Sequence, residues 1–142
     1  MAKKAKKAKA QEKRVPYPDL VNTRLTQIRF TMDENKIDAL AVTYLPNIRY
    51  LTNFSGSAAT LFITHDEIHF VTDDRYEEQI KTELYDLPNF HTHISRDVWK
   101  YLADKKFLKK VTHMGFEADR LAYSEAVNIR NLIRPMKFKP TP

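Results

Sequence analysis

The sequence of 142 residues contains no cysteine, which excludes disulfide bonds, zinc-thiolate sites and thiol catalysis. It has only two glycines, Gly56 and Gly115. Glycine-rich phosphate loops of the dinucleotide and P-loop types need several residues without a Cβ atom, so neither type of nucleotide site is present. A run of about 18 apolar residues is also missing, which argues against a membrane span. Lysines rather than an apolar segment follow Met1, so we expect no secretory signal and a cytoplasmic protein.

Positive charge is concentrated in the first 18 residues, which carry seven Lys or Arg and a single acid, Glu12. The other 124 residues hold 17 basic and 17 acidic side chains, so the formal charge of +6 belongs to residues 1–18. A nucleic-acid-binding domain gathers Lys and Arg on a folded face, and the folded part has no such excess. We predict a disordered basic tail over residues 1–18 and no specific nucleic-acid partner. The tail can still make weak, salt-sensitive contacts with RNA, DNA or anionic lipid.

The remaining chain alternates between helical periodicity and short strand-like runs. A helix is predicted from Asp19 to about residues 35–36, because its apolar residues fall on one stripe: Val21, Leu25, Ile28 and Met32. Strands are expected at residues 39–43, 48–51, 58–64, 68–72, 90–94 and 109–114, of which 58–64 and 68–72 form an antiparallel hairpin. Further helices are expected after Asp74, from Ser95 or Asp97, and over residues 121–133. Interleaved strands and helices predict one α/β domain with a mixed sheet, spanning residues 19–142.

Two segments are unusually rich in aromatic, hydroxyl and turn-forming residues: NIRYLTNFSGS at 47–57 and TDDRYEEQ at 72–79. The first contains a loop, residues 52–57, centred on Gly56. Ser55 and Ser57 are candidate nucleophiles, but no histidine is placed near them by the sequence, so hydroxyls that satisfy turn backbone are the stronger interpretation. Asp74 and Glu77 have the spacing of a capping box at a helix start.

The histidines form two pairs that can be tested as metal ligands. His65 and His69 flank the expected hairpin turn, and His91 and His93 share one face of a strand. Either pair could bind a metal ion, yet each lacks a third ligand that the sequence makes evident. We therefore predict no metal site and no cofactor in this chain.

Four segments in order carry a family resemblance: a helix ending in MDENKIDALAV, then NIRYLTNFSGSAATLFIT, TDDRYEEQ and MGFEADRLAYSE. Together they resemble the N-terminal domain of the creatinase/prolidase/aminopeptidase P family, from about residue 20 to residue 133. The resemblance implies a three-layer α/β/α domain of ribonuclease-H-like topology. In such relatives a pita-bread catalytic domain follows, with two Asp, one His and two Glu around a dinuclear site for Mn, Co or Zn. This chain ends about where the linker to that domain begins, so none of its residues inherits those roles.

The resemblance also assigns roles to loop residues. It implies a loop that reaches the active site of a neighbouring subunit, formed here by Tyr50, Phe54, Ser55, Gly56 and Ser57. We expect Phe54 to be the exposed apolar tip, with a plug for the sheet edge as the alternative.

A second motif, TDxRY, is matched by Asp73, Arg75 and Tyr76. We interpret Arg75 first as an ion-pair partner or carbonyl binder at the helix start, and second as a substrate contact. Lys36, Asn53 and Asp74 stand where relatives often have glycine. Asn and Asp tolerate left-handed backbone, so the fold should accommodate them.

The function that the resemblance implies is that of a non-catalytic N-terminal domain of a metal-dependent Xaa-Pro peptidase, of the aminopeptidase P or prolidase type. It would act in a homo-oligomer and help to shape a neighbouring subunit's substrate pocket, without peptidase activity of its own. The alternative is a stand-alone module of the same fold that binds peptides or proteins.

Overall fold

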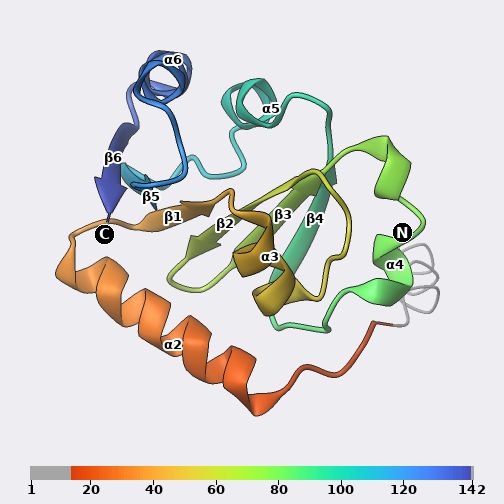
Figure 1. The fold of residues 1–142 in the computed structure, drawn as a ribbon. Helices are drawn as coiled ribbons and strands as arrows, with labels where there is room; N and C mark the ends of the chain where they lie inside the picture. The colour runs from red at the N-terminus through yellow and green to blue at the C-terminus, as the bar shows by residue number, and fades with distance from the viewer. Residues whose placement is uncertain (1–13, 142) are drawn as a thin grey trace.

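The computed structural model describes residues 14–141, in which six strands form one mixed sheet in the order β4-β3-β2-β1-β5-β6 (Figure 1). The elements are α2 (Asp19–Glu34), β1 (Ala39–Val42), α3 (Leu45–Thr52), β2 (Ala59–Thr64), β3 (Ile68–Thr72), the 3₁₀ turn η1 (Asp74–Tyr76), α4 (Ile80–Glu83), β4 (Phe90–Ile94), α5 (Val98–Lys105), β5 (His113–Glu117), α6 (Tyr123–Ile133) and β6 (Lys137–Thr141). Strands β1, β2 and β3 pair antiparallel, whereas β3–β4, β1–β5 and β5–β6 pair parallel.

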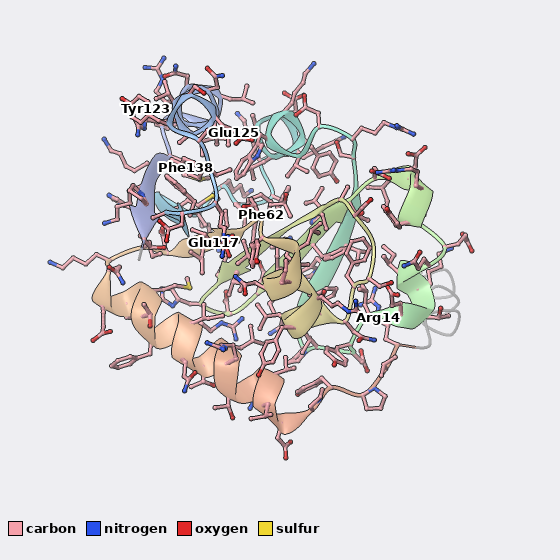
Figure 2. The ribbon with its side chains drawn as sticks, viewed as in Figure 1. Arg14, Phe62, Glu117, Tyr123, Glu125 and Phe138 are labelled. Atoms are coloured by element: carbon pink, nitrogen blue, oxygen red, sulfur yellow. The ribbon has the colours of Figure 1, made fainter. Side chains whose placement is uncertain are left out.

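Helices cover both faces of the sheet, which gives three layers (Figure 1). Successive strand residues point to opposite faces, so Leu61 and Phe70 join the core under α2 and α3, and Phe62 joins the core under α5 and α6. Figure 2 shows Phe62 and Phe138 in this second layer. The predicted α/β class with a mixed sheet and three layers is confirmed.

Helix α2 has the predicted bounds and the predicted stripe. Val21, Leu25 and Met32 are buried, and Ile28 packs against the same core at partial burial. Within the part of the chain that the structure describes, no helix has the length and apolar content needed to cross a bilayer.

Residues 48–51, predicted as a strand, lie in α3 instead, so that prediction is wrong. Ile48, Leu51 and Thr52 are the buried residues of this helix, at the i, i+3, i+4 spacing of a helical face. Pro46 lies in the first turn, where its missing N–H costs nothing. Because the segment is short and apolar, its periodicity alone does not distinguish a strand from a buried helix.

The start of α3 depends on Glu117, the last residue of β5 (Figure 2). One carboxylate oxygen accepts the backbone N–H of Thr43 at 2.8 Å and of Tyr44 at 3.0 Å, and the other accepts Asn47 Nδ2 at 2.7 Å. Glu117 lies 70 positions after Asn47 in the sequence. Its carboxylate therefore accepts hydrogen bonds that a capping side chain close to α3 would otherwise accept.

The last two strands also differ from the prediction. Strand β5 begins at His113 rather than at residue 109, and β6, which was not predicted, pairs with it in parallel. A Cβ atom at Gly115 would lie 2.6 Å from Ile37 Cδ1 and 2.7 Å from Thr141 Cγ2. Glycine is therefore required in this strand by close packing, and not by a turn.

The helix predicted after Asp74 is shorter than expected, because the 3₁₀ turn η1 is followed by the single turn α4. The cap is Asp73, whose carboxylate accepts the N–H of Arg75, so the predicted cap at Asp74 is off by one residue. Ile80 and Leu84 nevertheless pack in the core.

Part of the predicted tail contacts the domain. Val15 forms a parallel bridge with Tyr85, and its N–H donates to the carbonyl of Leu84 at 2.9 Å. Tyr17 packs against the core under α2. The rest of the predicted tail, residues 1–13, lies outside the described residues.

Two of the three positions where relatives often have glycine adopt left-handed backbone: Lys36 with φ 57° and Asn53 with φ 71°. Asn53 ends α3 as its C-cap. Lys36 follows α2, is exposed, and has a Cβ atom that disfavours this conformation.

We predict that Lys36→Gly stabilises the domain by about 0.5–1 kcal/mol, because relief of the left-handed strain exceeds the entropic cost of glycine. Thermal unfolding of the 142-residue chain measures this as a rise in Tm of a few degrees. Lys36→Ala is the matched control, since it keeps the Cβ atom and should not stabilise. Equal Tm values for the two variants would show that strain at Lys36 is negligible.

Candidate functional site

The fold brings the two sequence motifs together at one end of the β2–β3 hairpin. The backbone N–H of Ser57 donates to the Tyr76 hydroxyl at 3.0 Å, and the two hydroxyls lie 2.7 Å apart. These hydrogen bonds from Ser57 lower the pKa of Tyr76. The loop is thus fastened to the 3₁₀ turn that follows β3.

Phe54 does not form an exposed tip, which corrects the sequence prediction. Its side chain is 2% exposed and packs edge-on against Phe70 and Tyr76, each with a centroid distance of 5.1 Å. A Cβ atom at Gly56 would lie 2.7 Å from the Tyr76 ring and would also collide with Phe54. Gly56 is therefore needed because two aromatic rings lie beneath it, and the loop's exposed residues are Ser55 and Ser57.

Glu83 holds the other side of the loop, a role that the sequence did not reveal. Its carboxylate accepts the backbone N–H of Ser55 at 3.0 Å and also the Ser55 hydroxyl, while Gln79 donates to it at 3.0 Å. Burial opposes the charge, yet the hydrogen bonds from Ser55 and Gln79 and the charge of Arg49 leave the pKa of Glu83 below its usual value. The serine hydroxyls are thus occupied by Glu83 and Tyr76, and neither contacts a histidine, so the structure gives no support to a serine nucleophile.

The TDxRY motif forms an ion pair, which is one of the interpretations given for Arg75. Arg75 binds both oxygens of Asp73, with Nε–Oδ1 at 3.0 Å and a second nitrogen 2.7 Å from Oδ2. The hydrogen bonds from Arg75 lower the pKa of Asp73, and the carboxylate raises that of Arg75. The pair fixes the turn that presents Tyr76 to the loop.

Tyr50 belongs to a different surface from the rest of the predicted loop. It lies on α3, is 43% exposed, and stacks under the guanidinium of Arg24 at 5.5 Å from its ring centroid. With Asn47 and Glu117 it lines a groove of about 510 Å³ beside α2. The structure therefore separates Tyr50 from Ser55 and Ser57.

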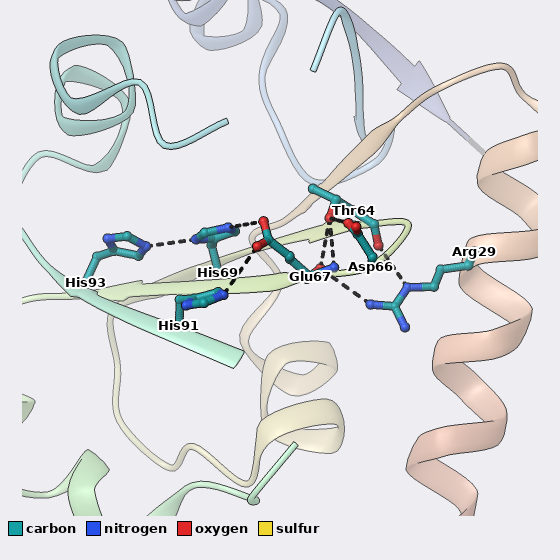
Figure 3. A network of polar contacts seen from close by, with 7 residues as sticks. All are labelled: Arg29, Thr64, Asp66, Glu67, His69, His91 and His93. Atoms are coloured by element: carbon teal, nitrogen blue, oxygen red, sulfur yellow. Dashed lines mark hydrogen bonds and ion pairs between the residues drawn. The ribbon is translucent and has the colours of Figure 1, made fainter. Parts of the chain in front are cut away.

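A second polar cluster lies at the opposite end of the hairpin, among Glu67, His69, His91 and His93 (Figure 3). Glu67 is 3.2 Å from His69 Nε2 and 3.5 Å from His91 Nε2, and His69 Nδ1 is 2.9 Å from His93 Nε2. Burial, assisted by the neighbouring histidines, lowers the pKa of His93 to about 4, and burial also lowers the pKa of His69. The histidine pairs predicted from the sequence are regrouped: His69 joins His91 and His93, while His65 faces Asp33 at 3.4 Å.

This donor set does not fit the dinuclear metal site of the catalytic domain that the resemblance implied. That site uses four carboxylates and one histidine, whereas the ligand cluster found among residues 14–141 has two histidines and one carboxylate. The chemistry of a dinuclear site is therefore not assigned to these residues.

The arrangement defines a class of protein: a three-layer α/β domain in which the two sequence motifs build a fixed loop and no nucleophile paired with a base. The chain belongs to the creatinase/prolidase N-terminal domain family, whose model matches residues 24–142.

Solved structures agree with this membership. The chain is similar to a Xaa-Pro aminopeptidase from Streptococcus pyogenes, with 30% identity and a TM-score of 0.73, over 85% of this chain and 91% of that one. It is also similar to the N-terminal domain of a putative metallopeptidase from Corynebacterium diphtheriae, with 31% identity and a TM-score of 0.71, over 85% of this chain and 95% of that one.

One curated relative is the uncharacterized peptidase YqhT of Bacillus subtilis, which is 38% identical over 61 residues. This match spans 43% of the chain and 17% of the length of that peptidase.

We predict that Glu83→Gln destabilises the domain at pH 7 by about 1 kcal/mol, because Ser55 loses a charged acceptor. The pKa of Glu83 is lower in the folded state, so its stabilisation is complete above the usual value of 4.5 and disappears as the pH falls through the folded value. Urea unfolding at a series of pH values should therefore show the two proteins converge as the pH falls from 4.5 through the lowered pKa of folded Glu83.

The matched control is Glu78→Gln, whose carboxylate is 87% exposed and paired with Lys81. This substitution should change stability little at any pH. A gap between wild type and Glu83→Gln that persisted at acid pH would contradict a role for the ionised carboxylate.

Proposed function

We propose that this domain is the non-catalytic N-terminal part of a metal-dependent Xaa-Pro peptidase, and that it shapes the substrate pocket of a neighbouring subunit in a homo-oligomer. The observation that carries the proposal is the family match over residues 24–142 combined with a loop whose serines are both occupied by structural partners. A named Xaa-Pro aminopeptidase with the same fold at 30% identity supports the substrate class. The divalent metal ions for cleavage then belong to the catalytic domain.

The loop after α3 is suited to a positioning role because its shape is fixed from beneath and from both sides. Phe54 anchors it in the core, Tyr76 holds Ser57, and Glu83 holds Ser55. A preformed loop can border a substrate without the entropic cost of ordering on binding. A contact surface for a second subunit is supported by Phe30, which is 64% exposed at the rim of a hollow of about 670 Å³ beside α2.

The first expected outcome concerns the isolated chain. Incubation of the 142-residue protein with Mn²⁺, Co²⁺ or Zn²⁺ and an Xaa-Pro peptide should give no cleavage, as followed by release of the N-terminal amino acid. Turnover by pure protein that grew in proportion to its concentration would overturn the non-catalytic assignment.

The second outcome concerns the loop in a peptidase that carries this domain together with a catalytic domain. We predict that Ser57→Trp raises KM for an Xaa-Pro peptide by about tenfold or more, because the added bulk enters the space that the substrate occupies. The kcat value should change less, since no reacting group is touched.

Two controls separate crowding from other effects. Tyr76→Phe removes the hydroxyl contact with Ser57 without adding bulk. Ser124→Trp adds the same bulk at an exposed position on a different element, helix α6. Sedimentation velocity should show the same oligomeric state for all variants. If Ser57→Trp and Ser124→Trp gave equal KM values, the loop would not border the substrate.

A further inference from the structure

We propose that Glu67, His69 and His91 bind one divalent transition-metal ion, with Zn²⁺ as the best-matched ion, at the outer edge of the sheet. This site is independent of the catalytic metal ions of the proposed peptidase and goes beyond the proposed function. It uses residues of this chain alone.

The sheet register explains why these three side chains converge. Glu67 immediately precedes β3, and His69 is the second residue of that strand. Their spacing of two residues brings the Glu67 carboxylate to within 3.2 Å of His69 Nε2. In the parallel pairing of β3 with β4, His91 is the register partner of His69. The two imidazole rings stack with centroids 4.8 Å apart, and the carboxylate of Glu67 faces both of them (Figure 3).

The distances are close to those of a metal-binding group. Donor atoms bound to a tetrahedral Zn²⁺ lie about 3.3–3.5 Å from one another, since Zn–N and Zn–O bonds are about 2.0–2.2 Å. The carboxylate oxygens of Glu67 lie 3.2 Å from His69 Nε2 and 3.5 Å from His91 Nε2. One ligand atom from each of the three residues lies within 4.8 Å of the others, so a small rotation of the exposed His91 ring completes the geometry.

Two residues behind the cluster can set the tautomer that a metal ion needs. His69 Nδ1 lies 2.9 Å from His93 Nε2, and His93 Nδ1 lies 3.0 Å from the Tyr101 hydroxyl. Without metal, His69 Nε2–H donates to the Glu67 carboxylate. His93 Nε2–H then donates to His69 Nδ1, and the Tyr101 hydroxyl donates to His93 Nδ1. When Nε2 binds a metal, this chain of hydrogen bonds reverses: His69 donates to His93, which donates to the hydroxyl oxygen of Tyr101. Metal-bound histidines are commonly oriented by such a hydrogen bond from the second ring nitrogen.

The surroundings favour an open coordination position. The His69 side chain is 7% exposed and lies under the Phe107 ring at a centroid distance of 4.9 Å, whereas Glu67 and His91 are close to half exposed. Glu67 and Phe107 also line a groove of about 350 Å³. Asp38 and Asp66 in this groove favour a cation, and Lys109 and Lys110 oppose it. A water molecule or a small anion can therefore complete the coordination of Zn²⁺.

The test uses the 142-residue chain without an affinity tag, titrated with Zn²⁺ by calorimetry and with Co²⁺ by visible absorption. We expect one ion per chain, a Co²⁺ spectrum of four-coordinate type, and a rise in Tm with added Zn²⁺. His91→Gln and Glu67→Gln should each weaken the affinity by at least about tenfold and remove the rise in Tm. Both positions are half exposed, so the Tm without metal reports whether the fold is kept.

Two further variants sharpen the result. His113→Gln removes an exposed histidine from β5, outside the cluster, and should leave the affinity unchanged. Tyr101→Phe removes no ligand but takes away the acceptor for His93, so it should weaken the affinity by about tenfold. Tyr101→Phe with unchanged affinity would exclude Tyr101 as a positioning residue.

The proposal fails if Zn²⁺ does not bind below millimolar concentration, which would leave the cluster as an ion-pair network only. It also fails if His91→Gln and Glu67→Gln bind Zn²⁺ as tightly as the wild type. Neither outcome affects the proposed peptidase function, which is tested by peptide cleavage and KM.

Discussion

The antiparallel pairing of β2 with β3 is the constraint on which both polar surfaces of the domain depend. Ala59 pairs with Thr72 at one end of this hairpin and Ile63 pairs with Ile68 at the other. The first end places the loop after α3 beside the turn that follows β3, and the Thr72 hydroxyl donates to the carbonyl of Ala58 at 2.6 Å. The second end places the carboxylate of Glu67 beside the imidazole ring of His69. One register therefore positions the fastened loop and the histidine cluster together.

Burial on both faces makes this register hard to change. Leu61 and Phe70 are buried under α2 and α3, while Phe62 and Val71 are buried under α5 and α6. A slip of one residue would exchange the two sets of side chains and would move His69 to the core under α2. Since β2 and β3 pair with neighbours on both sides, such a slip would also break the pairing with β1 and β4.

The parts of the fold that could be predicted from the sequence are those with a local signal. The stripe of α2, the hairpin 58–64 and 68–72, and the strand Phe90–Ile94 each carry their periodicity within a few residues. Asp97 was one of two candidates for the cap of α5, and its carboxylate accepts the N–H of Lys100. The β6 strand, with its polar sequence KFKPT, offers no such pattern and depends on its partner β5.

Features of the site that needed distant residues were missed for a different reason. The burial of Phe54 depends on Phe70 and Tyr76, and the helical state of α3 depends in part on Glu117. The third ligand at the histidine cluster requires the pairing of β3 with β4, which the sequence does not specify. Pairs such as Glu67 and His69 at i, i+2 are visible in a sequence, but the strand opposite them is not.

The two ends of the hairpin differ in what their polar groups are free to do. At the loop end, the Ser55 and Ser57 hydroxyls are bound to Glu83 and Tyr76, and exchanging these partners would release the loop from the domain. At the histidine end, the donor atoms of Glu67, His69 and His91 face one another, with His69 buried and His91 exposed.

A metal ion there would replace hydrogen bonds among the ligands themselves, with the strands already held by their backbone pairing. Binding at that end therefore disturbs little of the fold. The loop end offers a fixed shape to a neighbouring molecule, and the histidine end offers exchangeable ligands.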